Sequence, residues 1–306
     1  MKLSIVIPLY NEQESLAPLV EAISTVMEAH GYSYEIVFVD DGSTDGSFDT
    51  IRSLKAQYGQ IRAFRFNRNY GKAAGLSVGI ANARGEIIVT MDADLQDDPA
   101  AIPALLAKLD EGYDLVSGWK KIRHDPASFT IPSRIWNYST SILAGVKLHD
   151  FNCGLKAYRA ETAKNLEIYG EQHRYLPVLA HWEGWRVTEI PVIHHERRFG
   201  RSKYGFNKFF RGFLDLLALL FLRRYLRSPL HFFGLIAMLL IGAGCIVLAW
   251  FGIQWVVNGA LHLRPLMVLS LGAVIVGIQF FSFGFLAEML VRMSPHSSYH
   301  VRETIE

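Results

Sequence analysis

The pattern of apolar and polar positions divides the chain into two parts. Up to about residue 204, short apolar runs alternate with polar turns that contain glycine. Strands are predicted at residues 3–8, 35–40, 61–66, 86–91 and 114–117, and helices at 12–29, 44–58, 72–83 and 99–109. Strands and helices that alternate in this way predict an α/β fold, with a mostly parallel sheet and helices on both of its faces.

The last third of the chain is far more apolar. Between residues 230 and 257 the strongly polar side chains are His231 and Gln254, and between 266 and 287 they are Gln279 and two serines. Each run exceeds the ~20 residues that a helix needs to cross ~30 Å of hydrocarbon. The sequence therefore predicts two transmembrane helices joined by a short loop. The alternative is a pair of helices buried in a large soluble core.

Positive charge predicts how these helices are oriented. Arg223, Arg224 and Arg227 precede the first apolar run and Arg292 follows the second, whereas the loop between them carries Arg264 alone. By the positive-inside rule, both termini and the globular part face the cytoplasm. The chain begins with a strand pattern and not with a signal peptide, so we expect a multi-pass protein of the cell (inner) membrane.

The segment that leads into the first apolar run is strongly basic. Residues 201–227 carry seven Lys or Arg side chains and one acid, Asp215. Apolar side chains recur there at helical spacing: Phe206, Phe209, Phe210, Phe213, Leu217 and Leu220. This predicts an amphipathic helix over 205–228, which can lie on an anionic leaflet, pack on the globular domain, or do both.

Polar residues follow each of the first four predicted strands. They lie at residues 8–12, 40–45, 67–72 and 92–94. Ligands of parallel α/β sheets bind beyond the carboxyl ends of the strands, so these residues are expected to line one crevice. No G-x-G-x-x-G run follows the first strand and no G-K-S/T loop is present, which excludes a typical dinucleotide fold or P-loop. Two cysteines, Cys153 and Cys245, suit no disulfide framework.

An acidic block follows the fourth predicted strand. Asp92 and Asp94 are separated by one residue, so both point to the same side of the pleat and can hold a divalent cation against phosphate oxygens. Ligands with oxygen alone, without His or Cys, favour Mg²⁺ or Mn²⁺ over zinc. Asp97 and Asp98 precede Pro99 and are typical of a helix start.

These blocks resemble those of a known family. The runs IPLYNE (7–12), VDDGSTD (39–45) and DADLQDDP (92–99) resemble the signatures of family 2 glycosyltransferases of the GT-A fold. The run HERRFGRSKY (195–204), followed by two apolar helices, is similar to the polyprenyl-phosphate subgroup, such as dolichyl-phosphate mannose synthases and undecaprenyl-phosphate glucosyltransferases. The resemblance covers nearly the whole chain, in order.

The resemblance implies a domain organisation and a reaction. A cytoplasmic GT-A catalytic domain would span 1–204, the amphipathic helix 205–228, a transmembrane hairpin 229–290 and a cytoplasmic tail 291–306. The enzyme would transfer one sugar, with inversion, from a UDP- or GDP-sugar to undecaprenyl or dolichyl phosphate, for a glycan of the cell envelope. We expect no nucleic-acid partner.

Roles on the donor side also follow from the resemblance. The nucleotide would be bound by residues from four strand ends: Pro8, Tyr10, Glu12, Asp40, Lys72, Asp92 and Ala93. The ammonium of Lys72 can face a phosphate at a helix start, although a solvated surface lysine is the alternative. The metal ligands would be Asp92, Asp94 and Gln96, with Asp94 foremost, and the metal would stabilise the departing diphosphate.

The remaining roles concern the sugar and the acceptor. Asp150 would orient the donor sugar or act as a base, and we favour orientation. A lipid phosphate is already an anion near neutral pH, so cations that position it can replace a base. Arg197 and Lys203 match the basic positions of the subgroup's R-x-x-G-x-S-K motif. Further candidates for contacts with the acceptor phosphate are Lys120, Arg123, Arg134 and Ser202.

Two rival functions are less consistent with the sequence. A processive polysaccharide synthase would carry a Q-x-x-R-W motif and more membrane helices, whereas the run at 172–175 has the wrong spacing. A non-catalytic membrane adaptor would have lost the acidic block, which is intact. A homo-oligomer is possible because Gly242, Gly244, Gly272 and Gly277 can allow close helix contacts.

Overall fold

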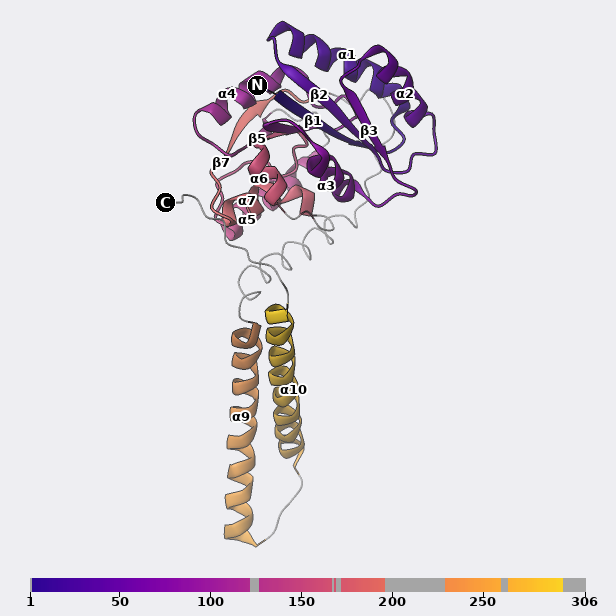
Figure 1. Cartoon of the computed structure of the whole chain (residues 1–306). Helices are drawn as coiled ribbons and strands as arrows, with labels where there is room; N and C mark the ends of the chain where they lie inside the picture. Colours follow the sequence, from indigo (N-terminus) through magenta and orange to yellow (C-terminus); the bar gives the residue numbers. More distant parts are fainter. Residues whose placement is uncertain are drawn as a thin grey trace, which may run out of the picture. The chain divides into compact units, whose positions relative to one another are not determined.

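The computed structural model describes residues 2–121, 127–166, 168, 172–195, 229–259 and 264–293 (Figure 1). It contains two compact units, Met1–Asp215 and Leu216–Glu306, which are described one at a time below. The domain boundary predicted near residue 204, the amphipathic helix predicted over 205–228 and most of the predicted tail lie outside the described residues.

The first unit is built on one seven-stranded sheet in the order β3-β2-β1-β4-β6-β5-β7. The strands are β1 (Lys2–Leu9), β2 (Ser33–Asp40), β3 (Ile61–Arg65), β4 (Ile87–Thr90), β5 (Leu115–Lys120), β6 (Lys156–Arg159) and β7 (Val187–Val192). The first four are parallel to one another, and β7 is parallel to β5. Strand β6 is antiparallel to both of its neighbours, β4 and β5. The predicted α/β fold with a mostly parallel sheet is confirmed.

Helices cover both faces of this sheet. They are α1 (Gln13–Ala29), α2 (Ser47–Gln57), α3 (Lys72–Asn82), η1 (Pro99–Ala101), α4 (Ile102–Asp110), α5 (Ala127–Ala144), α6 (Ala160–Asn165), η2 (Gln172–Arg174) and α7 (Leu176–Trp182). One apolar core joins the sheet to α1, α2 and α4, and a second joins it to α3, α6 and α7. The sheet is therefore buried on both sides, as parallel sheets usually are.

Helix α3 lies unusually close to β1 because two of its residues lack a side chain. A Cβ atom at Gly79 would lie 2.3 Å from Val6 Cγ1, and one at Gly75 would lie 2.9 Å from Pro8 Cβ. This approach places Lys72, the first residue of α3, at the edge of the sheet where the parallel strands end. The close packing of Gly75 and Gly79 on β1 thus fixes the position of Lys72.

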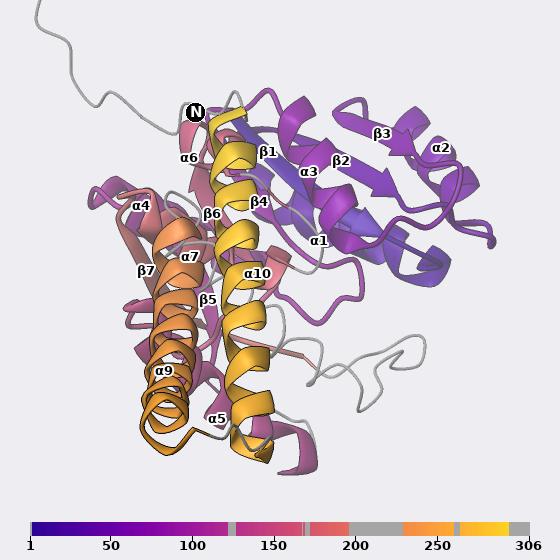
Figure 2. The same cartoon turned by 90° about the horizontal axis from the view of Figure 1, so that it is seen from below.

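The second unit contains two long apolar helices, α9 (Pro229–Asn258) and α10 (Pro265–Met293), which run side by side (Figure 2). Both are long and apolar enough to cross a membrane. They pack closely at glycines: a Cβ at Gly244 would lie 2.7 Å from the Ser270 carbonyl oxygen, and one at Gly277 would lie 2.6 Å from Ile241 Cγ1. No described atom lies within 4 Å of such an atom at Gly242 or Gly272. Of the four glycines expected to allow close contacts, two therefore serve the hairpin itself.

Candidate functional site

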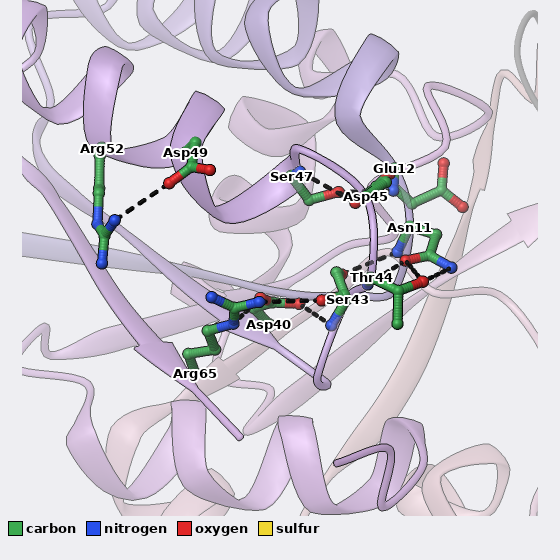
Figure 3. A network of polar contacts seen from close by, with 10 residues as sticks. All are labelled: Asn11, Glu12, Asp40, Ser43, Thr44, Asp45, Ser47, Asp49, Arg52 and Arg65. Carbon is green, nitrogen blue, oxygen red and sulfur yellow. Dashed lines mark hydrogen bonds and ion pairs between the residues drawn. The ribbon is translucent and has the colours of Figure 1, made fainter. Parts of the chain in front are cut away.

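The loops that follow β1 and β2 are joined by a network of hydrogen bonds (Figure 3). The backbone N–H of Asn11 donates to Ser43 Oγ at 2.9 Å, and the backbone N–H of Thr44 donates to Asn11 Oδ1 at 2.8 Å. Asn11 has a φ of 55°, which asparagine tolerates better than most residues. Tyr10 and Glu12, expected at the nucleotide, lie in this joined segment, and Pro8, expected there too, lies near the end of β1.

Asp40, at the end of β2, is fully buried and already engaged. Its carboxylate accepts the Ser43 N–H at 2.9 Å and forms an ion pair with Arg65 Nε at 3.2 Å (Figure 3). Arg65 also donates to the Ser43 carbonyl at 3.0 Å. Asp40 therefore stabilises the conformation of the loop that follows β2.

The neighbouring Asp41 does something that the sequence did not indicate. Its two carboxylate oxygens accept the backbone N–H groups of Tyr70 and Gly71 at 2.6 and 2.8 Å. This draws the loop before α3 onto the loop after β2. Gly42, with a φ of 73°, is required there because a Cβ would lie 2.6 Å from the Arg68 carbonyl carbon.

Asp92 lies between a lysine and a glycine. Lys72 Nζ donates to Asp92 Oδ1. On the other side, a Cβ at Gly154 would lie 2.7 Å from Asp92 Cγ, so only glycine leaves room for this carboxylate. The Thr90 hydroxyl fixes Gly154 by donating to its carbonyl oxygen at 3.0 Å. The loop before the antiparallel strand β6 thus lies against Asp92 on one side, and Lys72 contacts it on the other.

Asp94 and Gln96 follow at a sharp turn in which Leu95 has a φ of 60°. Asp94 Oδ1 accepts the Gln96 N–H at 3.2 Å, and Asp94 is largely buried whereas Asp92 is partly open. Among the described residues, no group of three His, Cys, Asp or Glu side chains is placed to hold a metal ion. The oxygen donors of Asp92 and Asp94 fit a hard cation that takes its other ligands from phosphate or water, as Mg²⁺ commonly does.

Asp97 is the buried centre of an ion-pair cluster. Its Oδ1 lies 3.6 Å from Lys120 Nζ and 3.7 Å from His194 Nδ1. Burial alone would raise the pKa of Asp97, but Lys120 and His194 lower it well below its usual range. Burial would likewise lower the pKa of Lys120, but the charge of Asp97 raises it. Lys120, a candidate for the acceptor phosphate, is thus held inside the domain by Asp97.

This cluster connects the acidic block to residues almost one hundred positions later. Asp97 and His194 form an isolated antiparallel bridge, and the His195 N–H donates to the Gln96 carbonyl at 2.8 Å. His195 Nε2 also lies 3.2 Å from Asp98 Oδ2. Residues 194 and 195 are thus fastened to the acidic loop, and the basic run at 197–203 that follows them in the sequence lies outside the described residues. No local pattern in the sequence indicates this pairing.

Asp150 is fully buried in a loop that β7 holds in place. Glu189 accepts the N–H groups of His149 at 2.8 Å and of Asp150 at 3.3 Å, and His149 stacks on Trp119 with 4.3 Å between ring centroids. Asp150 Oδ1 accepts the Asn152 N–H at 2.9 Å. Glu189 and Trp119 are residues that the sequence reasoning missed.

A buried lysine and a buried cysteine complete this region. Lys156 is the first residue of β6, and its ammonium donates to the Cys153 carbonyl. Burial lowers the pKa of Lys156, whereas it raises the pKa of the Cys153 thiol to about 12. A thiol with so high a pKa is no nucleophile at neutral pH, which agrees with a site built from carboxylates and cations.

Several predicted site residues cannot be placed in this geometry. Arg123, Arg197, Ser202 and Lys203 lie outside the described residues, and only the helix, not the side chain, is described at Arg134. The described part brings together the ends of β1, β2 and β4, the start of α3 and the loop at 150–156. Buried Ala93 lies within the acidic turn.

The chain is similar to known proteins over most of its length. The model of the family described as Glycosyl transferase family 2 matches residues 4–166. A dodecaprenyl-phosphate galacturonate synthase from Rhizobium johnstonii is 38% identical over 298 residues, which is 95% of this chain and 88% of that protein.

Solved structures share the fold at low sequence identity. A glucosyl-3-phosphoglycerate synthase from Mycobacterium tuberculosis, solved with Mn²⁺, UDP and phosphoglyceric acid, has a TM-score of 0.57 and 18% identity over 72% of this chain and 78% of that chain. A mannosyltransferase from Pyrobaculum calidifontis, solved with GDP-Man and Mn²⁺, has a TM-score of 0.51 and 16% identity over 97% of this chain and 76% of that chain. The sheet is therefore GT-A-like, and the chain belongs to glycosyl transferase family 2.

Proposed function

We propose that this glycosyltransferase moves one sugar from a nucleotide-diphosphate sugar to a polyprenyl phosphate, with inversion and with a divalent cation. The observation that carries the proposal is the 38% identity to a dodecaprenyl-phosphate galacturonate synthase, which extends over 95% of this chain. A match of that extent takes in both the acidic loop and the two apolar helices. Transfer at the cytoplasmic face of the cell membrane follows from the positions of the arginines.

The donor half of the proposed site is the crevice around Asp92. Asp92, Asp94 and Gln96 would hold the cation and the diphosphate, and the cation would supply charge neutralisation of the leaving group. Lys72 stands at the first turn of α3, where helix N–H groups also favour a phosphate. The base and ribose would lie against the loops after β1 and β2, with Pro8, Tyr10 and Glu12 in contact and Asp40 fixing the shape.

Asp150 is proposed to orient the donor sugar. Its loop is held by Glu189, so the carboxylate is fixed before the substrate arrives. No general base is needed if the acceptor is a phosphate, because a phosphomonoester with a second pKa of ~6 is an anion at neutral pH. Cations that position this anion would then do the work of a base, and Arg197 and Lys203 are proposed for it, with Arg123, Arg134 and Ser202 as further contacts.

Helix α5 supports a lipid as the acceptor. Its outer side is apolar, with Tyr138 70%, Ile142 62% and Leu143 53% exposed. Its inner side carries Asn137 and Thr140, which are only 3% and 0% exposed. A helix that turns apolar side chains outward and polar ones inward suits contact with hydrocarbon better than contact with water.

The relative named above suggests which sugar to try first. That protein is a galacturonate synthase, so a UDP-hexuronate is the first donor we propose. The solved neighbours contain UDP-glucose in one case and GDP-Man in another, and therefore leave the choice of base open. Mg²⁺ and Mn²⁺ are both proposed as cations.

A reconstituted assay tests the proposal. The purified full chain would be incubated with undecaprenyl phosphate and, in turn, UDP-galacturonate, UDP-glucose and GDP-mannose. We expect a lipid-linked sugar whose anomeric configuration, measured by NMR coupling constants, is opposite to that of the donor. EDTA should stop transfer, and Mg²⁺ or Mn²⁺ should restore it. Retention of configuration, or full activity in EDTA, would contradict inversion or the cation respectively.

A further inference from the structure

The loop between α5 and β6 carries an exposed histidine whose ring is fixed by its neighbours. The side chain of His149 is 67% exposed, yet its ring stacks on Trp119 with 4.3 Å between ring centroids and 17° between ring planes. Its Nδ1 contacts Glu189 Oε1, and its backbone N–H donates to the same carboxylate at 2.8 Å. The ring is therefore held in one orientation before any substrate binds.

The contact with Glu189 determines which ring nitrogen is free. The Glu189 carboxylate accepts the backbone N–H groups of both His149 and Asp150, so it acts as an acceptor and Nδ1 supplies the proton. In the neutral ring the lone pair is then on Nε2, as it is where a carboxylate orients a catalytic or metal-binding histidine. Among the described residues, none bonds to Nε2. His149 thus offers a hydrogen-bond acceptor at the surface, where a ligand can reach it.

This acceptor lies at the edge of the sheet that holds the proposed donor site. Strands β4 and β5 run in the same direction, because both are antiparallel to β6, which lies between them. Asp92 follows β4, and Trp119 is the last residue but one of β5, so both lie at the same edge. The loop that carries His149 also reaches the acidic block, since Gly154 lies against Asp92. The free nitrogen is therefore on a loop of the site, directly before Asp150.

The chemistry of Nε2 indicates the kind of group that it binds. A lone pair without a proton suits a hydroxyl group, which can donate, and does not suit a diphosphate or a phosphate dianion, which can only accept. Removal of a proton is not needed, because the proposed acceptor substrate is already an anion near neutral pH. The hydroxyl groups of the donor sugar are the hydrogen-bond donors that remain.

We propose that His149 is a binding residue for the donor sugar: its Nε2 accepts a hydrogen bond from a sugar hydroxyl, and Glu189 and Trp119 hold the ring in place. The proposal rests on the proposed function, because it assumes that a nucleotide sugar binds beside Asp92. It adds a contact to the sugar itself. A polar group built to bond a substrate hydroxyl is one of the features by which an enzyme distinguishes similar sugars.

Three variants of His149 separate this contact from a structural role. His149→Ala removes the ring, His149→Asn keeps an amide near the position of Nδ1, where it can still contact Glu189, and His149→Gln keeps an amide near the position of Nε2. UDP-galacturonate, UDP-glucose, GDP-mannose, UDP and GDP are each titrated with Mn²⁺ into the full chain in detergent, without a lipid acceptor. Isothermal titration calorimetry gives the dissociation constants.

The expected loss is confined to ligands that carry the sugar. We expect His149→Ala and His149→Asn to weaken binding of the cognate sugar nucleotide about 3- to 10-fold, which corresponds to one hydrogen bond, and to leave the binding of UDP and GDP unchanged. His149→Gln should bind the sugar nucleotide nearly as the parent does, because its amide oxygen can accept from the hydroxyl.

His30 provides the matched control. It is also exposed, its ring stacks on Tyr32 with 5.6 Å between ring centroids, and its Nδ1 lies 3.0 Å from the Val26 carbonyl oxygen. It follows the end of α1, shortly before β2 begins, and therefore lies at the opposite edge of the sheet from the proposed site. His30→Ala should leave every dissociation constant unchanged.

The outcomes distinguish this proposal from the proposed function. Equal binding of every ligand by His149→Ala and the parent overturns the proposal. Equal weakening of all five ligands, or a loss that His149→Asn recovers, also overturns it, because either result indicates that the ring only supports the loop. Weaker binding of a sugar nucleotide alone supports the contact even if no sugar reaches a lipid. Failure of the parent to bind any sugar nucleotide would instead contradict the proposed function, on which this contact depends.

Discussion

Two pairs of carboxylates lie within one loop of this enzyme, and they have opposite surroundings. Asp92 and Asp94 lie near Lys72, Gly154 and the turn at Leu95, where Asp92 is partly exposed and Asp94 is largely buried. Asp97 is sealed between Lys120 and His194, and Asp98 caps η1 by accepting the Ala100 N–H at 2.9 Å.

Neighbouring acidic residues in one motif can therefore have different roles, one in binding a ligand and the other in stabilising the loop. The first pair is proposed to bind the cation: Asp92 is partly exposed, Asp94 is largely buried, and the neighbours of Asp92 come from α3 and from the loop before β6. The carboxylates of the second pair are engaged in contacts within the protein. These contacts connect the acidic loop to β5 and to residues 194 and 195. The run that resembles a metal-binding signature thus contains both the proposed cation ligands and the ion pairs that hold their loop in place.

The largest effect is expected from Asp94→Asn. This change keeps the shape of the side chain but removes the negative charge proposed for the cation, and losing one such electrostatic contact costs about 100- to 1,000-fold in rate. We expect sugar transfer to fall by at least that factor while the melting temperature stays the same. Steady-state kinetics and differential scanning fluorimetry in detergent measure the two quantities. Parent-like activity would remove the proposed role of Asp94 in holding the cation.

Asp97→Asn should lower the stability of the fold, in contrast to Asp94→Asn, which should lower the transfer rate. The variant leaves the buried Lys120 without its carboxylate, and breaking a buried ion pair typically costs about 3–5 kcal/mol. Denaturant unfolding of the full chain in detergent, followed by circular dichroism, measures the change. The double variant Asp97→Asn/Lys120→Met should regain part of the loss. A single variant as stable as the parent would mean that Asp97 is not the centre of this cluster.

Acid titration sharpens the same contrast. The folded-state pKa of Asp97 lies below its unfolded value, so its ion pairs contribute stability that is fully present above about pH 4 and is lost as the pH falls through the folded pKa. Asp97→Asn should therefore lose less stability than the parent between pH 4 and pH 2. Parallel curves of melting temperature against pH would contradict the lowered pKa.

Asp98→Ala should have the smallest effect. It removes a helix cap, which is worth about 1 kcal/mol, and the contact with His195. We expect a melting temperature a few degrees lower and transfer within about threefold of the parent, a change smaller than the 1.4 kcal/mol that corresponds to tenfold. A loss as large as that of Asp94→Asn would place Asp98 with the ligand-facing pair.

The sequence predicted the half of the fold in which periodicity is strong. The strands from β1 to β5 and the helices α1, α2, α3 and α4 all appear where apolar runs and polar turns placed them. It did not predict β6, because four residues are too few to show a period, nor that β6 would enter the sheet antiparallel and put Gly154 under Asp92.

From the sequence, site residues could be placed only where they follow directly from the ends of predicted strands and helices. Asp92 and Lys72 could be placed because strand ends of a parallel sheet converge, and the structure brings their side chains together. The partners of Asp97 and of Asp150 could not, since His194 and Glu189 lie 97 and 39 residues further along the chain. Such pairings depend on tertiary packing, for which a single sequence carries no periodic signal.

A lipid-labelling assay directly tests whether the enzyme transfers sugar to a polyprenyl phosphate and whether Asp94 is needed for it. Radiolabelled UDP-galacturonate and a panel of other UDP- and GDP-sugars are incubated with undecaprenyl phosphate and the parent, Asp94→Asn or Asp98→Ala enzyme, and label in the lipid phase is counted. We predict that one donor labels the lipid with the parent and with Asp98→Ala, and that Asp94→Asn leaves the lipid unlabelled. Equal labelling by all three proteins, or label that stays in water-soluble product with the parent, would contradict the account.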